Sequence, residues 1–298
     1  MKAGVINIGD ELLIGQTVNT NLTWLGKNLG DVGISIYKST TILDEEDEII
    51  AALDDYMQEA DLIIITGGLG PTNDDITKET LTQYFETELV LNQQVLARIE
   101  SYFSAMQKEM LPSNVQQAML PKDALVIDNQ HGTASGMWFE RNGKVIISLP
   151  GVPYEMKALV IEEIIPRLKS SYGIKGKYHQ TIMLQGIGES FLAEKIHDWE
   201  QRIYEDQLHL AYLPSTGLIK LRLTADKGIE DAAKINRYFK ELEHRFPEYV
   251  YGYNEANIFN EVGKLFIARN LTLGTVESCT GGGIANAFIQ FPGTSSFF

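Results

Sequence analysis

Hydrophobic residues in the first 170 positions alternate between the spacing of strands and the spacing of helices. Compact apolar runs over 2–8, 33–42 and 61–66 predict three strands. The segments between them carry apolar residues three or four positions apart, which predict helices with one buried face: Val18, Leu22, Leu25, Leu29 and Val32 in the first, and Ile49, Ile50, Leu53 and Met57 in the second. Strands that alternate with helices in this way predict a mainly parallel sheet covered on both faces.

The same region continues with helical segments and a hairpin. Residues 76–120 predict helices that are broken near Pro112 and Pro121. Residues 137–140 and 144–149 predict a hairpin, because the intervening Asn142-Gly143 is typical of a tight turn. A helix is then predicted to end near Pro166, and residues 170–176 predict a linker. The apolar face of that helix is marked by Met156, Leu159, Val160 and Ile164.

The remaining sequence predicts a smaller unit followed by a fragment. Strands are predicted over 179–185, 208–213 and 217–225, and helices over 189–204 and 229–246. From Asn257 the pattern predicts a helix, a strand over 272–276 and a loop over 277–283. Since about 40 residues do not easily close a core, this last segment is expected to be the front of a truncated domain. The predicted domains are 1–172, 173–252 and 253–298.

Composition and charge narrow the class of protein. With 44% hydrophobic and 22% charged residues, the chain of 298 residues can bury ordinary cores. Its apolar runs are too short to span a bilayer, its start lacks a signal-peptide pattern, and Cys279 is its single cysteine, so a cytoplasmic protein is expected. The formal charge of −15 argues against direct nucleic-acid binding. It also implies that a phosphate ligand would be neutralised by backbone N–H groups or by a cation.

The strongest chemical signal is the segment TGGLGPTNDDIT at 66–77, between a predicted strand and a predicted helix. Gly67, Gly68 and Gly70 permit a sharp turn and close approach to a ligand, and the helix start presents N–H groups to phosphate. Asp74 and Asp75 provide carboxylate oxygens for a divalent cation. The alternative is an ordinary tight turn in which an Asp caps the helix.

Three further segments follow predicted strands or end at helix starts. Gly9-Asp10-Glu11 follows the first strand and Asp44 follows the second, so both belong at the sheet edge that carries the glycine loop. For the first, capping of the next helix is an equally good explanation. HGTASG at 131–136 and LPGVPYEM at 149–156 are glycine-containing turns, of which the second leads into a helix N-terminus. Each of these turns is weak evidence by itself.

In combination these segments resemble a known family. GDELLIGQTVNTN, TGGLGPTNDDITKE, GTASGM and LPGVPYEM, in this order, resemble the amino-terminal domain of the CinA (competence/damage-inducible) family, which is similar to the molybdopterin-binding fold of MogA and MoeA. Residues 186–190 and 212–214 resemble the family's KH-like domain, and ESCTGG at 277–282 resembles the opening of its carboxy-terminal domain. The resemblance implies a three-layer α/β sandwich with a mainly parallel sheet, then a small α+β KH-like domain, then the start of an α/β domain.

The resemblance also implies activities and site residues. The amino-terminal domain is expected to hydrolyse the pyrophosphate of ADP-ribose, in pyridine-nucleotide recycling, with a divalent cation of the Mg or Co class and optionally a monovalent cation. Asp44 and Asp75 match catalytic positions, and Asp44, Asp74 and Asp75 are the expected metal ligands. The expected substrate- and phosphate-binding residues are Gly9, Asp10, Glu11, Thr66, Gly67, Gly68, Gly70, Gly132, Ser135, Pro150, Gly151 and Glu155.

Two departures from the family pattern limit these expectations. Ser135 stands where proline is common, which is expected to alter loop stiffness only. Ser278 matches the nucleophile of a nicotinamide mononucleotide deamidase, but the residues that would activate it are not within this sequence, so no deamidase activity is expected. The KH-like unit lacks the second glycine of a GXXG clamp at 186–189 and is expected to be structural or dimer-forming.

The sequence therefore leaves three functions in order of preference. The first is a cytoplasmic, homodimeric, metal-assisted nucleotide pyrophosphatase. The second is a molybdopterin- or nucleotide-binding module with little catalysis. The third, suggested by the family's name alone, is a partner in competence or the response to DNA damage, without direct DNA contact or membrane association.

Overall fold

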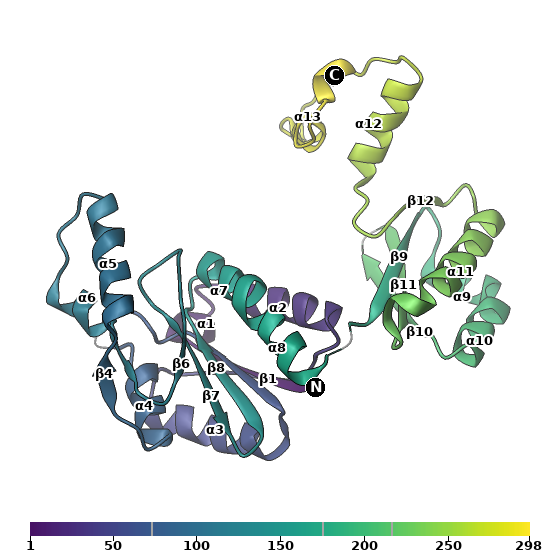
Figure 1. Cartoon of the computed structure of the whole chain (residues 1–298). Coiled ribbons are helices and arrows are strands. Elements are labelled where there is room, and N and C mark those ends of the chain that lie inside the picture. Colours follow the sequence, from purple (N-terminus) through teal and green to yellow (C-terminus); the bar gives the residue numbers. More distant parts are fainter. Residues whose placement is uncertain (73, 175, 216) are drawn as a thin grey trace. The chain divides into compact units, whose positions relative to one another are not determined.

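The chain folds into two compact units. The computed structural model describes residues 1–72, 74–174, 176–215 and 217–298. Met1–Gly176 form the first unit and Lys177–Phe298 the second (Figure 1). Asn73 of the glycine loop and Lys175 of the predicted linker lie outside the described residues.

A six-stranded, mainly parallel sheet forms the centre of the first unit. Its strand order is β2-β1-β3-β8-β7-β6. The neighbours β2, β1, β3 and β8 run parallel, whereas β7 and β6 are antiparallel to their neighbours. The predicted parallel sheet is therefore confirmed. The strands are β1 (Lys2–Ile8), β2 (Ser35–Ile42), β3 (Leu62–Thr66), β6 (Leu125–Ile127), β7 (Gly136–Arg141) and β8 (Lys144–Leu149).

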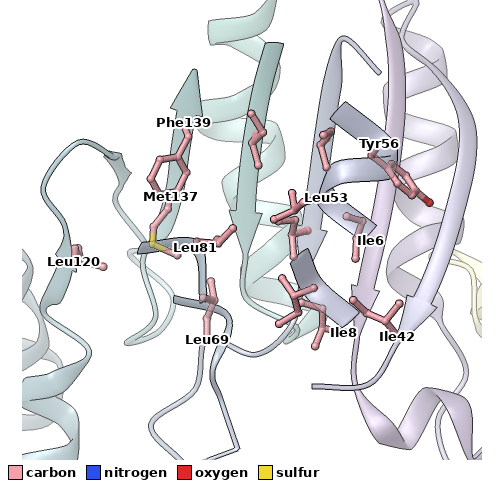
Figure 2. Packing of buried hydrophobic residues seen from close by; sticks show 14 of the residues in the cluster. Ile6, Ile8, Ile42, Leu53, Tyr56, Leu69, Leu81, Leu120, Met137 and Phe139 are labelled. Atoms are coloured by element: carbon pink, nitrogen blue, oxygen red, sulfur yellow. The ribbon is translucent and has the colours of Figure 1, made fainter. Parts of the chain in front are cut away.

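The central strands are buried on both faces because helices cover both faces of the sheet. In β1, Val5 packs into one hydrophobic cluster and Ile6 into the other, as expected for side chains that alternate across a sheet. The cluster around Ile6 includes Leu53 and Tyr56 of α3 (Glu46–Glu59) (Figure 2). A Cβ at Gly4 would lie 2.0 Å from the Tyr56 ring, so glycine is required there for this packing.

Two helical layers complete the predicted three-layer sandwich. One face is covered by α2 (Thr20–Asp31), α7 (Pro153–Leu159) and α8 (Ile165–Tyr172), as Figure 1 shows. The other is covered by α3, α4 (Thr77–Tyr84) and α5 (Gln93–Ala105). Two short helices, α1 (Asp10–Leu13) and α6 (Pro112–Gln116), lie in connections.

Three details of the first unit differ from the prediction. Val18 precedes α2 and is 80% exposed, so it does not belong to the buried face of that helix. The helix predicted to end near Pro166 continues to Tyr172, which also shortens the predicted linker. A π-helical turn over Val160–Ile164 ends two residues before Pro166, and this wider turn accommodates the proline ring and its missing N–H.

Short strands were also missed in the first unit. Residues 76–127 contain β4 (Leu89–Leu91) and β5 (Met119–Pro121), which pair with each other, as well as β6. The predicted hairpin is confirmed as β7 and β8. Asn142 and Gly143 form its turn with φ values of 54° and 74°, the geometry that an Asn-Gly turn favours.

The second unit contains a four-stranded antiparallel sheet of order β10-β11-β9-β12. Its strands are β9 (Tyr178–Gln185), β10 (His209–Ser215), β11 (Leu218–Ala225) and β12 (Val250–Tyr253). Helices α9 (Glu189–Lys195), α10 (His197–Glu205) and α11 (Ala232–Arg245) share a core with it that contains Trp199 and Phe239. The single helix predicted over 189–204 is divided at Ile196, whose φ of −110° departs from helical geometry.

Residues 254–298 contain α12 (Ile258–Ala268) and α13 (Gly283–Ile289). The strand predicted over 272–276 is wrong, because this segment is irregular. An isolated extended segment leaves its N–H and C=O groups without a ladder. In this segment Leu273 N donates to Phe297 O at 2.6 Å. Among the described residues, no helix has both the length and the apolar character needed to cross a membrane.

Candidate functional site

Four loops meet at one edge of the first sheet because the strands before them run parallel. β1, β2, β3 and β8 end at Ile8, Ile42, Thr66 and Leu149, which are paired in register across the sheet or lie next to paired residues. Two backbone bonds tie the loops together: Gly9 N donates to Ile42 O at 3.2 Å, and Gly67 N donates to Leu149 O at 3.1 Å. This is the edge at which open α/β sheets bind ligands.

A cavity of about 410 Å³ lies at this edge. It brings together eleven of the residues that the sequence analysis selected: Gly9, Asp10, Glu11, Asp44, Gly67, Gly68, Gly70, Asp74, Asp75, Pro150 and Gly151. Five of these are acidic. Among the described residues that line the cavity, none is basic. The cavity is therefore strongly acidic.

The glycine loop has a shape that other residues could not adopt. Gly67 has φ +110°, and a Cβ there would lie 2.1 Å from the backbone oxygen of Ile8. Gly68 has φ +64°, and a Cβ there would lie 2.0 Å from Thr77 Oγ1. Both positions combine a positive φ with close contact, so glycine is required at each. The loop backbone consequently lies directly against β1 and the start of α4.

Asp75 holds this loop in shape. Its Oδ1 accepts a hydrogen bond from Gly70 N at 2.8 Å, and its Oδ2 accepts one from Thr72 N at 3.0 Å and another from the Thr72 hydroxyl. A carboxylate that accepts hydrogen bonds from backbone N–H groups takes the place of the backbone acceptors that these groups lack in a tight turn. Asp75 thus has a structural role in addition to lining the cavity. The N–H groups of Gly67 and Gly70 are both used inside the protein and do not remain for phosphate.

Asp44 is the electrostatically unusual group of the site. Burial raises the pKa of Asp44 from 3.8 to about 6. A backbone hydrogen bond from Ile76 opposes this rise, and the nearby negative charges of Asp75 and Asp74 add to it. Its Oδ1 is buried and accepts no hydrogen bond in the parts of the chain that the structure describes. The Thr77 hydroxyl, which faces Gly68 as Asp44 Oδ1 does, is buried without a partner too. Two polar oxygens beside the glycine loop are therefore left for a ligand.

Asp74 differs from Asp44 although both line the same cavity. A hydrogen bond from the Thr72 side chain lowers the pKa of Asp74, which is fully exposed. Asp74 thus stays ionised under conditions in which Asp44 titrates. Neighbouring carboxyls with pKa values shifted apart are typical of sites that bind charged ligands or transfer protons.

The acidic residues do not form a closed metal cage. Within the described ranges, no group of three or more His, Cys, Asp or Glu side chains is arranged to hold a metal ion. Because Asp75 uses both oxygens to hold the loop, Asp44 and Asp74 are the two of the three expected metal ligands that remain for a cation. This donor set fits an ion such as Mg²⁺, which keeps several waters and uses one or two carboxylates together with substrate phosphates.

Some of the selected residues lie outside the acidic cavity. Thr66, buried at the end of β3, lines a neighbouring cavity, and Gly132 and Glu155 line neither of the two. Glu155 accepts a hydrogen bond from Asn129 Nδ2 at 2.6 Å, and a Cβ at Gly132 would lie 2.1 Å from its Oε2. The carboxylate of Glu155 therefore anchors the loop before β7. Ser278 is an exposed residue of the second unit.

Ser135 is held by a partly buried arginine. Arg98 of α5 donates to the Ser135 hydroxyl at 3.0 Å and to the carbonyls of Asn129, Gly132 and Thr133. Proline at this position could not accept that bond, so the departure noted in the sequence adds a hydrogen bond as well as changing loop stiffness. Ser135 also lines a small hollow together with Gly68, Gly70 and Asp75.

Comparison with known proteins matches three family models to consecutive parts of the chain. Residues 4–170 match the probable molybdopterin binding domain, 179–252 the KH domain of the damage-inducible protein CinA, and 255–298 the CinA carboxy-terminal domain. A CinA-like protein of Flavobacterium psychrophilum is 41% identical over 100% of this chain and 72% of its own length. Another, of Cytophaga hutchinsonii, is 42% identical over 99% of this chain and 71% of its own length.

This chain belongs to the CinA-like family. The crystal structure of CinA from Thermoplasma acidophilum, a protein described as of unknown function, is 35% identical with a TM-score of 0.50, and the match covers 55% of this chain and 97% of that one. The resemblance inferred from the sequence motifs is confirmed. The acidic cavity lies entirely within the segment that matches the molybdopterin binding domain.

The sequence analysis missed a cation beside the glycine loop of this CinA-like chain. Lys78 in the first turn of α4 lines two hollows with Gly70 and Asp75, and its Nζ donates to Gln116 O at 2.9 Å. Gln117 lines both hollows too, and its buried Oε1 has no partner in the described part of the chain. The signal was a lone lysine directly after the TGGLGPTNDDIT segment, which a search for basic clusters passes over.

Proposed function

We propose that the amino-terminal unit hydrolyses the pyrophosphate bond of ADP-ribose or a related nucleotide with the help of a divalent cation. The observation that carries the proposal is the acidic cavity at the carboxyl ends of the parallel strands, where Asp44 has a pKa of about 6 and an unpartnered Oδ1. A diphosphate would be repelled by five acidic residues unless a cation accompanied it. The cavity of about 410 Å³ is within the ordinary size of a small-molecule site.

The chain's own residues would divide the work. Asp44 and Asp74 would hold the cation, which when bound neutralises phosphate charge and lowers the pKa of an attacking water. Asp75 would keep the loop in the shape that admits a phosphate. Lys78 follows the glycine loop in the sequence and lines a hollow together with Gly70. Its ammonium would supply positive charge and pair with a phosphate oxygen.

The test is turnover of ADP-ribose by the full chain, with AMP and ribose 5-phosphate measured as products. We expect turnover to require a divalent cation, to stop with a chelator, and to fall by about 100-fold or more in Asp44→Asn. Asp47→Asn is the matched control, because Asp47 is an exposed carboxylate in the first turn of α3 outside the cavity. Turnover that is insensitive to the chelator, or full activity in Asp44→Asn, would overturn the proposal.

A second function is a pterin- or nucleotide-binding module without hydrolysis. It is supported by the match of residues 4–170 to a probable molybdopterin binding domain. Calorimetry with a pterin phosphate and with ADP-ribose separates the two functions. Tight binding of both ligands without any AMP release favours the binding module.

A further inference from the structure

A second, less acidic cavity adjoins the acidic one. It has a volume of about 270 Å³, and the two share Ile8, Glu11, Gly151 and Val152 as walls. The new walls come mainly from residues 17–21, which precede and begin α2. Among the described residues that line this cavity, Glu11 is the single charged one. A molecule that extends out of the acidic cavity over the shared wall would therefore enter a nearly neutral compartment.

Two asparagines in this cavity have fixed orientations. Asn19 Oδ1 accepts a hydrogen bond from Leu22 N at 2.9 Å and so caps α2. Asn21 Nδ2 donates to Gly151 O at 2.7 Å, and Asn21 is only 9% exposed. These bonds determine which end of each amide remains: the nitrogen of Asn19 and the oxygen of Asn21. Both remaining atoms are buried and lack partners in the described chain.

The unpartnered Asn19 Nδ2 and Asn21 Oδ1 are unusual because buried polar atoms without a hydrogen bond destabilise the folded state. A buried polar atom without a hydrogen bond costs about 1–3 kcal/mol, and native proteins contain few of them. Here one donor and one acceptor belong to residues two positions apart that line the same cavity. A ligand with an acceptor next to a donor would satisfy both. Heterocyclic bases present this pattern on their edges.

The other walls offer apolar surface for a flat ring. Leu12, Val18, Val152 and Pro153 line the cavity. Val18 is 80% exposed and Val152 43% exposed, which leaves apolar side chains open to solvent at its mouth. Small-molecule sites combine apolar walls with a few placed polar groups in this way. The neutral amides and Glu11 make the same compartment a poor site for a phosphate.

We propose that this cavity binds the planar heterocyclic base of the ligand, with Asn19 Nδ2 donating to a ring acceptor and Asn21 Oδ1 accepting from an amino or ring N–H group. The proposal rests on the proposed function only in placing the diphosphate next door, in the acidic cavity. Its chemistry is shared by nucleotide bases and pterins. The base compartment therefore selects for ligands that carry a ring, whereas the acidic cavity handles the phosphates.

The test is calorimetry of the full chain with Mg²⁺ present, using AMP, ribose 5-phosphate and a pterin phosphate as probes. We expect wild type to bind AMP or the pterin phosphate at least about 10-fold more tightly than ribose 5-phosphate, which lacks a ring. Asn19→Ser keeps a side-chain oxygen that can cap α2 and removes the amide donor without adding charge, so it should weaken the ring-bearing probe by about 10-fold and leave ribose 5-phosphate unchanged. Val18→Ala, outside the helix, should weaken the same probe by a few-fold. Whichever ring binds more tightly identifies the source of the ligand.

Asn28→Ser provides the matched control on the same helix, because Asn28 Nδ2 donates to Trp24 O at 2.9 Å and Asn28 does not line the cavity. Equal binding of AMP, the pterin phosphate and ribose 5-phosphate by wild type, or equal losses for ring-bearing and ringless probes in Asn19→Ser, would overturn the base compartment. Ring-selective binding without ADP-ribose hydrolysis would refute the proposed pyrophosphatase and leave the compartment intact. Hydrolysis of ADP-ribose without ring-selective binding would support the pyrophosphatase and refute the base compartment.

Discussion

Replacing Asp44 by Asn should stabilise the first unit above neutral pH. Folding raises the pKa of Asp44 from 3.8 to about 6, so the folded protein binds this proton more tightly than the unfolded chain does. The cost of the charge is therefore absent below pH 3.8, grows as pH rises, and is complete above pH 6. Asn has no such charge. Because Asp44 Oδ1 accepts no hydrogen bond in the described chain, the amide also loses little there.

The size of the effect follows from the shift. A rise of about 2 pKa units corresponds to about 3 kcal/mol at most. Asp44 is only half-buried, so solvent screening reduces this to about 1–2 kcal/mol. For a unit of this size, each kcal/mol moves the melting temperature by about 2–4 °C. Differential scanning calorimetry at pH 4 and pH 8 should then show Asp44→Asn melting about 2–8 °C above wild type at pH 8 and level with it at pH 4.

Two comparisons make this prediction strict. Asp47→Asn, an exposed carboxylate of the same helix start, should change the melting temperature little at either pH. Millimolar Mg²⁺ should raise the melting temperature of wild type at pH 8 and thus narrow its gap to Asp44→Asn, because a bound cation removes the cost of the charge. If Asp44→Asn were no more stable than wild type at pH 8, the assigned cause of the pKa shift would be wrong.

Two further predictions concern the loops around the cavity. Gly67→Ala should destabilise the first unit by about 3 kcal/mol in urea unfolding, because the new Cβ would clash with Ile8 O at a residue with φ +110°. Gly15→Ala, at φ +74° with open space around it, should cost only about 1–2 kcal/mol. Equal costs for the two variants would show that the contact with Ile8 is unimportant. Arg98→Ala should lower the stability of the first unit by about 3 kcal/mol, because it leaves buried carbonyls and the Ser135 hydroxyl without their donor. Replacing the exposed Arg237 by Ala should lower stability by less than about 1 kcal/mol. Similar losses of stability in thermal melts of the two variants would contradict the role given to Arg98.

The parts of the fold that the sequence predicted are those with long, regular patterns. The strands β1 and β3 and the helix α2 were predicted because each repeats its hydrophobic spacing over several residues. The strands of three or four residues, β4, β5, β6 and β12, were missed because so short a run shows no period. The predicted strand at 272–276 had the right residue types but no neighbouring strand to pair with in the described chain.

The candidate site was partly predictable for a topological reason. Parallel strands bring their carboxyl ends to one edge, so residues that follow different strands, such as Asp44 and Gly67, could be expected near each other. What could not be predicted is which polar atoms are already occupied. The engagement of Asp75 with the loop, and the atoms left over on Asn19 and Asn21, depend on local geometry that no spacing reveals.

The reversed direction of β7 has a consequence for how members of this family can differ. Because β7 begins at the edge where the parallel strands end, the connection from β6 reaches the ligand side of the sheet without being part of any crossover. Insertions in a hairpin connection leave the order of the other strands untouched. If the carbonyls of this connection still accept hydrogen bonds from Arg98, its sequence and length can vary between family members. Such changes would alter the part of the candidate site next to Ser135 and leave the architecture of the sheet unchanged.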